Sequence, residues 1–428
     1  MSPRALSSLA VRARDAGAAK SDSVLAFYIS YDGVLEPLGE SQAVAYVEGL
    51  AGFGRMILIS FEKGSDLADR DALQRMKARL AARSITWVPM RYHKKPTVLA
   101  TTYDIIRGIV VGLLLIGSHR PGLVHARSYV AALIAWVLKR VSGVKFLFDM
   151  RGLWTNEKVD AGHWPPGSRI YRVAKRWERR FFESADGIVS LTEAGVAAFP
   201  SLGYRIPAGI PIEVIPTCTD LNRFVLGSKD PALAAKLGLD GHVVVGCTGN
   251  MSNTYLREPM LGCLAYLARS LNRLQILMVT LEDHDRLLAD ARSAGIPSSR
   301  LVVVRATFSD MPAYLRLMDF GLFFIKPCFS KKFSAATKLG EFLATGVPVV
   351  INDGIGDSGC LVRQEKVGVV LPGTDLGDVE AALDDIAALT RDPLIKQRCR
   401  ETAKKYFDLD QGVTKYAALY GTLLSPKA

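Results

Sequence analysis

The chain has 428 residues, enough for two domains, and its 49% hydrophobic and 22% charged residues are typical of a globular protein with sizeable cores. This composition excludes a disordered chain. The six cysteines contain no C-x-x-C pair, which argues against a disulfide framework or a cysteine zinc site and indicates free thiols in a reducing compartment.

The net charge of +12 is concentrated in the first half of the chain. Residues 1–218 carry 29 Lys and Arg against 19 Asp and Glu, so this half has a net charge of +10 and the rest only +2. Such asymmetry indicates an anionic partner, either a membrane surface, a phosphorylated lipid or a nucleic acid. A solvated basic surface is the alternative. Because no nucleic-acid-binding module is recognisable, we expect no nucleic acid partner.

The N-terminal half reads as short apolar strands that alternate with helical segments. Residues 1–22 contain no apolar stretch long enough for a secretory signal, and we expect a mobile tail there. The uninterrupted apolar run 109–116 is far shorter than the roughly 20 residues that span a bilayer, so we expect a buried or interfacial helix. Strands are predicted at 23–30, 56–61, 86–90, 123–126, 144–150, 186–191 and 212–216.

The same rhythm restarts after a polar stretch that begins at Pro216. The second series of strands is predicted at 242–249, 274–279, 301–304, 320–325, 347–352 and 367–371. Two such series predict an α/β protein with two facing, doubly wound, Rossmann-like domains and a cleft between them. We expect the tail at 1–22, the first domain at 23–216, the second at 217–405, and a C-terminal helix at 406–428 that packs back on the first domain.

A basic loop follows the fourth strand of the second series and leads into a helix. It carries Lys326 and Ser334, and Thr337 is the expected N-cap of the helix. Lys338 and Glu341 then lie one helical turn apart on the same face. Hydroxyls, lysines and free amides at a helix N-terminus hold phosphates, and a nearby carboxylate accepts hydrogen bonds from ribose hydroxyls. A surface Lys–Glu pair on a capped helix is the alternative.

The stretch FSAATKLGEFLATGVPVVIND is similar to the donor-binding signature of family 4 of the glycosyltransferases, which have the GT-B fold and are mostly retaining enzymes. This resemblance implies that Glu341 binds the donor ribose, that Lys338 contacts the diphosphate, and that Lys326 of the I-K-P triplet lies nearby. The family often carries a further glutamate eight positions earlier, where this chain has Phe333. This difference keeps open a catalytically impaired binding or scaffold subunit.

Further motifs resemble the same family and follow predicted strands. The loop from Tyr31 to Gln42 resembles a D-G-x-x-x-P-L-G-x-S-Q segment, which implies that Asp32 and Gly33 lie on the acceptor side. The backbone at Gly39 is then expected to approach the donor phosphate, since glycine permits a close approach. The turn after the strand at 242–249 resembles the one that opens the donor domain, which implies donor-binding roles for Asn250 and Ser252.

The segment FDMRG resembles the family's F-D-x-R-G motif near the catalytic cleft, which implies that Asp149 and Arg151 act in catalysis together with Lys326. The alternative interpretation is that Asp149 and Arg151 form a structural ion pair at a strand end. His125 ends another strand and is a candidate on the acceptor side, although a lone histidine is more often a structural hydrogen-bonding group. Cations and amides at the departing diphosphate stabilise it electrostatically.

The resemblance implies a metal-independent, retaining hexosyltransferase that uses a nucleoside diphosphate sugar and needs no other cofactor. The acceptor is expected on the N-terminal domain and is a hydroxyl of a glycan or lipid-linked acceptor in cell-surface polysaccharide synthesis. We expect a cytoplasmic protein whose basic N-terminal domain contacts an anionic membrane peripherally. A sugar-nucleotide epimerase on the same fold is a further alternative. The two Asp-x-Asp pairs, Asp69/Asp71 and Asp408/Asp410, do not follow strands and predict no metal site.

Overall fold

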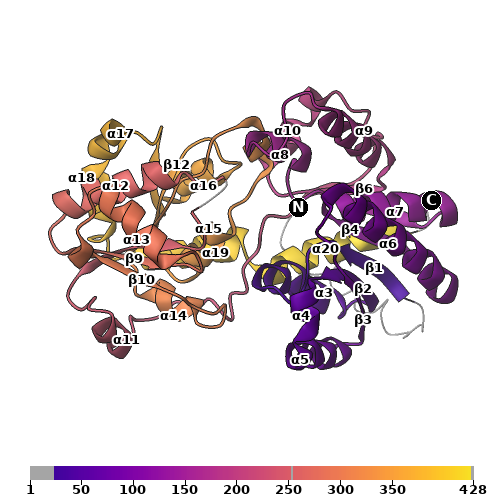
Figure 1. Ribbon diagram of the computed structural model, residues 1–428, viewed down its shortest axis with the longest axis horizontal. Coiled ribbons are helices and arrows are strands. Elements are labelled where there is room, and N and C mark those ends of the chain that lie inside the picture. The colour runs from indigo at the N-terminus through magenta and orange to yellow at the C-terminus, as the bar shows by residue number, and fades with distance from the viewer. Residues whose placement is uncertain (1–23, 252–253, 426–428) are drawn as a thin grey trace, which may run out of the picture. The chain divides into compact units, whose positions relative to one another are not determined.

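The computed structural model describes residues 24–251 and 254–425, which form two compact units (Figure 1). Unit 1 comprises residues 24–191, 196–215 and 409–425. Unit 2 comprises residues 192–195 and the rest of the described chain between 216 and 408. The tail expected at 1–22 lies outside the described residues. Each unit is an α/β structure around one parallel sheet, so the prediction of two doubly wound, Rossmann-like domains is confirmed.

The sheet of unit 1 has seven parallel strands in the order β3-β2-β1-β4-β5-β6-β7. The order reverses between β1 and β4, and this switch point is where doubly wound sheets place their ligands. All seven strands predicted for this half are found. They are β1 (Val24–Ser30), β2 (Arg55–Glu62), β3 (Ile85–Arg91), β4 (Leu123–Arg127), β5 (Lys145–Asp149), β6 (Gly187–Ser190) and β7 (Ile212–Val214).

Helices cover both faces of this sheet. The long crossover helices α6, α7 and α9 pack side by side in one layer, whereas the last helix, α20, packs against α3 (yellow and indigo in Figure 1). The helices are α2 (Pro37–Gly39), a π-helix η1 (Glu40–Val44), α3 (Ala45–Leu50), α4 (Gly64–Ala68), α5 (Arg70–Ala81), α6 (Thr97–His119), α7 (Ser128–Ser142), α8 (Trp154–Asp160), α9 (Arg169–Ser184), α10 (Glu193–Ala197), η2 (Phe199–Leu202) and α20 (Leu409–Leu424).

Helix α6 is much longer than the uninterrupted apolar run on which its prediction rested. It has 23 residues and is, by length and composition alone, apolar enough to cross a membrane, whereas the run 109–116 is only part of it. The apolar run is flanked by Arg107 and by His119, but Arg107 does not end the helix, which begins at Thr97. One face of α6 nevertheless packs inside unit 1, where Gly108 lies against Ile134 of α7.

The sheet of unit 2 has six parallel strands in the order β10-β9-β8-β11-β12-β13. Its order reverses between β8 and β11, and all six predicted strands are found. They are β8 (Val243–Thr248), β9 (Leu274–Val279), β10 (Leu301–Val304), β11 (Phe320–Phe323), β12 (Val349–Asn352) and β13 (Gly368–Leu371). Buried aliphatic and aromatic side chains from these strands and their helices form one continuous core.

The helices of unit 2 connect these strands in the same alternating way. They are α11 (Pro231–Lys236), α12 (Arg257–Ser270), α13 (His284–Ser293), η3 (Ser298–Arg300), α14 (Met311–Arg316), η4 (Phe329–Phe333), α15 (Thr337–Ala344), α16 (Ser358–Glu365), α17 (Leu376–Ala381), α18 (Leu383–Leu389) and α19 (Ile395–Tyr406). After α19 the chain leaves unit 2 at Asp408 and returns to unit 1 with α20.

Candidate active site

Chemically active side chains of unit 1 gather where β1, β4 and β5 end. The strand register pairs Ser30 with Arg127 and Arg127 with Asp149, so the last residues of three neighbouring strands lie side by side. These are the carboxyl ends of parallel strands on either side of the switch point, where such sheets bind ligands.

Asp149 is the centre of a buried polar cluster at this edge. Its side chain is 1% exposed, and its Oδ2 accepts hydrogen bonds from Tyr416 Oη at 2.9 Å and His125 Nε2 at 3.3 Å. Its buried Oδ1 has no hydrogen bond partner among the residues that the structure describes. Burial opposes the charge, but attraction to Arg151 and to His125 outweighs it and holds the pKa of this carboxyl below its ordinary value. Asp149 is therefore ionised at neutral pH.

His125 is fully buried beside this carboxylate, against the ring of Tyr28. Burial lowers the pKa of His125 below its ordinary value even though Asp149 favours the charged form. The neutral imidazole must donate through Nε2, because a carboxylate only accepts, and Nδ1 then accepts from Tyr420 Oη at 2.8 Å. Asp149 thus fixes the tautomer of His125, and Tyr420 of α20 helps to fix its orientation.

Two arginines connect the cluster to the loop after β1. Arg127 Nη1 donates to Asp32 Oδ2 at 2.6 Å, and Arg151 Nη2 donates to Gln42 Oε1 at 3.1 Å. Arg151 has a φ of +55°, a left-handed conformation that is uncommon for a residue with a side chain and that is concentrated at functional sites. Burial opposes its charge, but Asp149 raises the pKa of Arg151 above its ordinary value, so both partners stay charged.

The loop that contains Asp32 is held by a buried glutamate at the end of β2. Glu62 accepts hydrogen bonds from the amides of Val34 at 3.0 Å and Leu35 at 3.2 Å. A Cβ added at Gly33 would lie 2.9 Å from Glu62 Oε2, and one added at Gly39 would overlap the carbonyl oxygen of Gly33. The close approach that requires glycine at position 39 is therefore within the loop itself. The expected approach of a donor phosphate to Gly39 stays a prediction.

Replacing Gly39 by alanine is expected to destabilise the protein by about 1–3 kcal/mol, because the new methyl group must displace the Gly33 carbonyl. Urea unfolding measures this difference. The matched control is Gly421→Ala in α20, where nothing lies within 4 Å and alanine favours the helix by about 1 kcal/mol. Equal stability of the two variants would contradict the tight loop.

In unit 2, Lys338 and Glu341 lie in the first turns of α15 and are both half-buried. The Lys338 Nζ lies 3.7 Å from the centre of the Tyr255 ring and close to Gly249. Burial lowers the pKa of Lys338 to about 8, against the attraction of neighbouring anionic groups. Burial raises the pKa of Glu341 to about 7, against the attraction of Lys338. Both groups therefore change charge near neutral pH, which is a mark of functional sites.

The loop before α15 is fixed by a side chain that hydrogen-bonds the backbone in the way that a neighbouring strand would. Asn352, at the end of β12, accepts from the amide of Ile325 through Oδ1 and donates to the carbonyl of Ile325 through Nδ2, each at 2.8 Å. The next residue, Lys326, donates its amide to the carbonyl of Thr254 at 2.8 Å. The turn after β8 and the loop after β11 are thus joined, and Lys326 has an exposed side chain at that junction.

The other predicted donor residues lie around the same strand ends. Asn250 is exposed after β8, and Ser334 precedes α15, whereas Ser252 lies outside the described residues. Thr337 is the first helical residue and not the N-cap; the N-cap is Ala336, which makes no side-chain cap hydrogen bond. That prediction was wrong because the extended backbone ends one residue earlier than the threonine suggested. Phe333 is completely buried, so this position presents no carboxylate to a sugar.

Several site residues were not singled out from the sequence. Gln42 lay inside a recognised motif, and Arg127 directly follows the strand predicted at 123–126, so its position at the end of a strand was an available signal. Tyr416 and Tyr420 had none, because only folding brings α20 to β4 and β5. Arg257, the first basic residue in the sequence after the turn that follows β8, is bound to Glu282 and Asp290.

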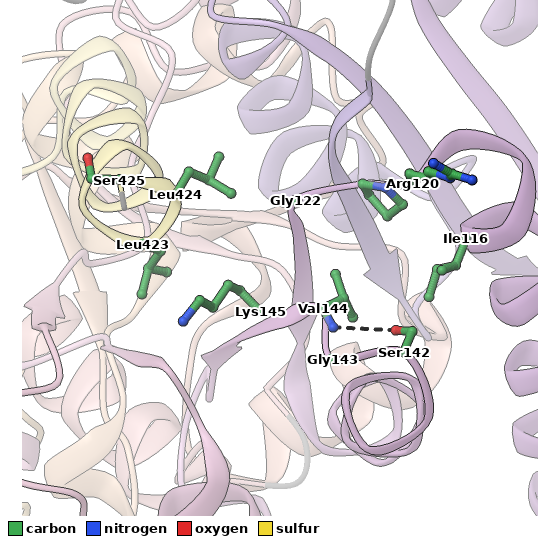
Figure 2. A pocket seen from close by; sticks show the side chains of 11 residues that line it. Ile116, Arg120, Gly122, Ser142, Gly143, Val144, Lys145, Leu423, Leu424 and Ser425 are labelled. Carbon is green, nitrogen blue, oxygen red and sulfur yellow. Dashed lines mark hydrogen bonds between the residues drawn. The ribbon is translucent and has the colours of Figure 1, made fainter. Parts of the chain in front are cut away.

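Figure 2 shows a hollow of about 550 Å³ in unit 1, lined by residues such as Arg120, Lys145 and Leu424. It lies at the amino ends of β4 and β5, opposite to the edge that carries Asp149, and is therefore not the candidate active site. Across the described ranges, no group of three or more His, Cys, Asp or Glu residues is placed to hold a metal ion.

Comparison with known proteins agrees with this arrangement. Residues 41–218 match the model of a family described as a glycosyl transferase 4-like domain. This part of the chain is therefore similar to family 4 of the glycosyltransferases. No curated protein sequence matches this chain.

Solved structures show that this chain has the GT-B fold. A sucrose-phosphate synthase from Thermosynechococcus elongatus is 14% identical with a TM-score of 0.68, over 94% of this chain and 99% of the other. A glycosyltransferase from Rickettsia africae is 13% identical with a TM-score of 0.70, over 95% and 100%. HepE from Anabaena, in complex with UDP and glucose, is 16% identical with a TM-score of 0.66, over 92% and 98%.

Proposed function

We propose that this protein is a glycosyltransferase that moves a hexose-type sugar from a nucleoside diphosphate sugar to a hydroxyl of a glycan or lipid-linked acceptor, with retention at the anomeric carbon. The observation that carries the proposal is the half-buried pair of Lys338 and Glu341 at the start of α15. A carboxylate and a cation one turn apart at a strand–loop–helix junction suit a ribose and a diphosphate.

The roles follow from the chemistry of the groups. Glu341, for which the described residues provide no hydrogen bond partner, accepts from the ribose hydroxyls. Lys338, Lys326 and the amides at the start of α15 stabilise the diphosphate as the anomeric carbon–oxygen bond breaks. Asn250, Ser252, Ser334 and Thr337 complete the proposed donor site. The complex of the Anabaena relative with UDP and glucose supports a UDP-sugar as the first donor to test.

Unit 1 is proposed to bind the acceptor. The ionised Asp149, with one oxygen that lacks a donor, is suited to accept a hydrogen bond from a substrate hydroxyl, and Arg151 favours its charged form. Asp32, Gly33 and His125 shape the same edge. The proposed reaction needs no metal, and its setting is polysaccharide synthesis on the cytoplasmic side of a membrane that the basic unit 1 contacts peripherally.

A donor panel tests this function. The purified protein is incubated with UDP-, GDP-, ADP- and CMP-sugars, with and without EDTA, and release of the nucleotide is followed while NMR reports the anomeric configuration of the product. We expect release from one nucleotide class, unaffected by EDTA, with the donor configuration retained. Binding of a nucleotide sugar without turnover, with or without an acceptor extract, would instead favour the scaffold subunit, which the buried Phe333 supports.

A further inference from the structure

Helix α6 presents an exposed apolar stripe along its whole length. Successive members are three or four residues apart, the spacing of one helical face. Their exposed fractions lie between 51% and 70%, which is unusual for side chains of this kind arranged in one row. The stripe consists of Leu99 (70%), Tyr103 (53%), Ile106 (55%), Val110 (51%) and Leu114 (68%).

The opposite face of α6 belongs to unit 1. Its buried members are Ala100, Asp104, Gly108 and Gly112, each four residues from the next. A Cβ added at Gly112 would meet the side chain of Leu138 at 2.8 Å, so the helix lies directly on α7. This packing fixes the rotation of α6 and directs the apolar stripe away from the unit.

The charges around the stripe are almost all positive. Exposed Lys94 and Lys95 precede the helix, Arg107 lies at the edge of the stripe, and exposed Arg120 follows the last turn. Between residues 92 and 122 the only acidic residue is Asp104, which is completely buried. An apolar face bordered by cations and without exposed carboxylates complements a bilayer with anionic headgroups.

The buried face connects the stripe to the candidate acceptor loop. Asp104 accepts hydrogen bonds from His93 Nδ1 at 2.6 Å, from the amide of His93 at 2.9 Å and from Tyr31 Oη at 3.1 Å. Tyr31 directly precedes Asp32, the partner of Arg127. The helix and the loop at the carboxyl end of β1 are therefore held in a fixed relation inside unit 1.

We propose that the apolar stripe of α6 is the membrane-docking face of this protein. The helix lies in the plane of an anionic bilayer surface, with Leu99 and Leu114 inserted among the acyl chains and the flanking lysines and arginines at the headgroups. The biological use of this face rests on the proposed function. A membrane-bound unit 1 would meet a lipid-linked acceptor at the bilayer surface.

Vesicle flotation tests the docking face with the full chain and no substrate. We expect the protein to float with vesicles of phosphatidylglycerol and phosphatidylcholine in equal parts, and to bind vesicles of phosphatidylcholine alone on the order of tenfold more weakly. The variant Leu99→Glu with Leu114→Glu is expected to lose binding at least about tenfold. The matched control is Leu376→Glu with Leu394→Glu, which adds the same charge at exposed leucines of unit 2.

Three outcomes would overturn the proposal: no binding of the wild-type protein to either vesicle, equal binding of the α6 variant and the control, or self-association in the absence of lipid that the α6 variant alone abolishes. The last result would assign the stripe to a second copy of the chain. Thermal unfolding with and without UDP is measured on both variants as a check on folding. Because vesicle binding needs no donor, a failed donor screen and a failed flotation are separate results.

Discussion

Replacing Glu341 by alanine is expected to remove most of the stabilisation that a nucleotide sugar gives the wild-type protein. A ligand that binds only the folded state at a hundredfold excess over its Kd adds about 2.7 kcal/mol to stability. Charge-assisted hydrogen bonds contribute about 1.5–3 kcal/mol, so their loss weakens binding by roughly tenfold to a hundredfold. Thermal unfolding with UDP-, GDP-, ADP- and CMP-sugars measures the change.

The matched control for this experiment is Glu365→Ala. Glu365 is a carboxylate of the same unit, but it accepts from Lys405 at 2.8 Å and Tyr406 at 2.7 Å on the surface, away from the start of α15. We expect the control to retain the full nucleotide-dependent shift. A Glu341→Ala protein that keeps this shift would contradict the assignment of α15 to the donor site.

The pH dependence of nucleotide binding follows from the same two groups. Below about pH 7 Glu341 becomes protonated, and above about pH 8 Lys338 loses its charge, so donor affinity is expected to be highest between these values.

The stability of the unliganded protein is expected to depend on pH in a different way. Because folding raises the pKa of Glu341, stability falls as pH rises from its ordinary value of 4.5 to about 7, and Glu341→Gln removes that fall. Calorimetric titration and urea unfolding across this range measure the two effects.

The strands were predictable from the sequence because each is a short apolar run between polar or glycine-containing segments. The residues of FDMRG and of the loop before α15 were also predictable, since the carboxyl ends of parallel strands carry the ligand-binding groups. What could not be predicted depends on distant parts of the chain. Tyr416 reaches Asp149 from a helix 267 residues later, and no local pattern marks a tyrosine on an amphipathic helix as a partner of a buried carboxylate.

Local geometry set a second limit on prediction. Gly39 was recognised from a motif, but the reason that glycine is needed there appears only when the loop is folded. A side chain at position 39 would overlap the carbonyl oxygen of Gly33. Likewise, the run of residues 109–116 was correctly seen as too short to span a bilayer, whereas the helix continues for 23 residues because Thr97–Asp104 is helical without being uniformly apolar. Helix length depends on capping and packing as well as on hydropathy.

Replacing Asp149 by asparagine is expected to reduce sugar transfer by about 10²–10³-fold, the usual effect of removing one electrostatic partner from a preorganised site. The amide keeps the shape of the side chain and an oxygen that can accept from His125, but it removes the negative charge that attracts Arg151. Removing the carboxylate that offsets the charge of Arg151 also costs about 3 kcal/mol of stability. Steady-state kinetics and urea unfolding measure the two losses.

The control that separates chemistry from stability is Asp186→Asn. Asp186 accepts from Lys139 at 2.6 Å and from the amide of Phe146 at 2.8 Å, at the amino ends of the strands. We expect this variant to lose stability and to keep its activity per folded molecule.

The stability of the wild-type protein also depends on the charge of Asp149. Because folding lowers the pKa of Asp149, the contribution of this carboxylate to stability is present above its ordinary pKa of 3.8 and is lost as pH falls through the lower pKa of the folded protein. Asp149→Asn should therefore unfold with a weaker dependence on acid, and full activity in that variant would reduce Asp149 to a structural partner of Arg151.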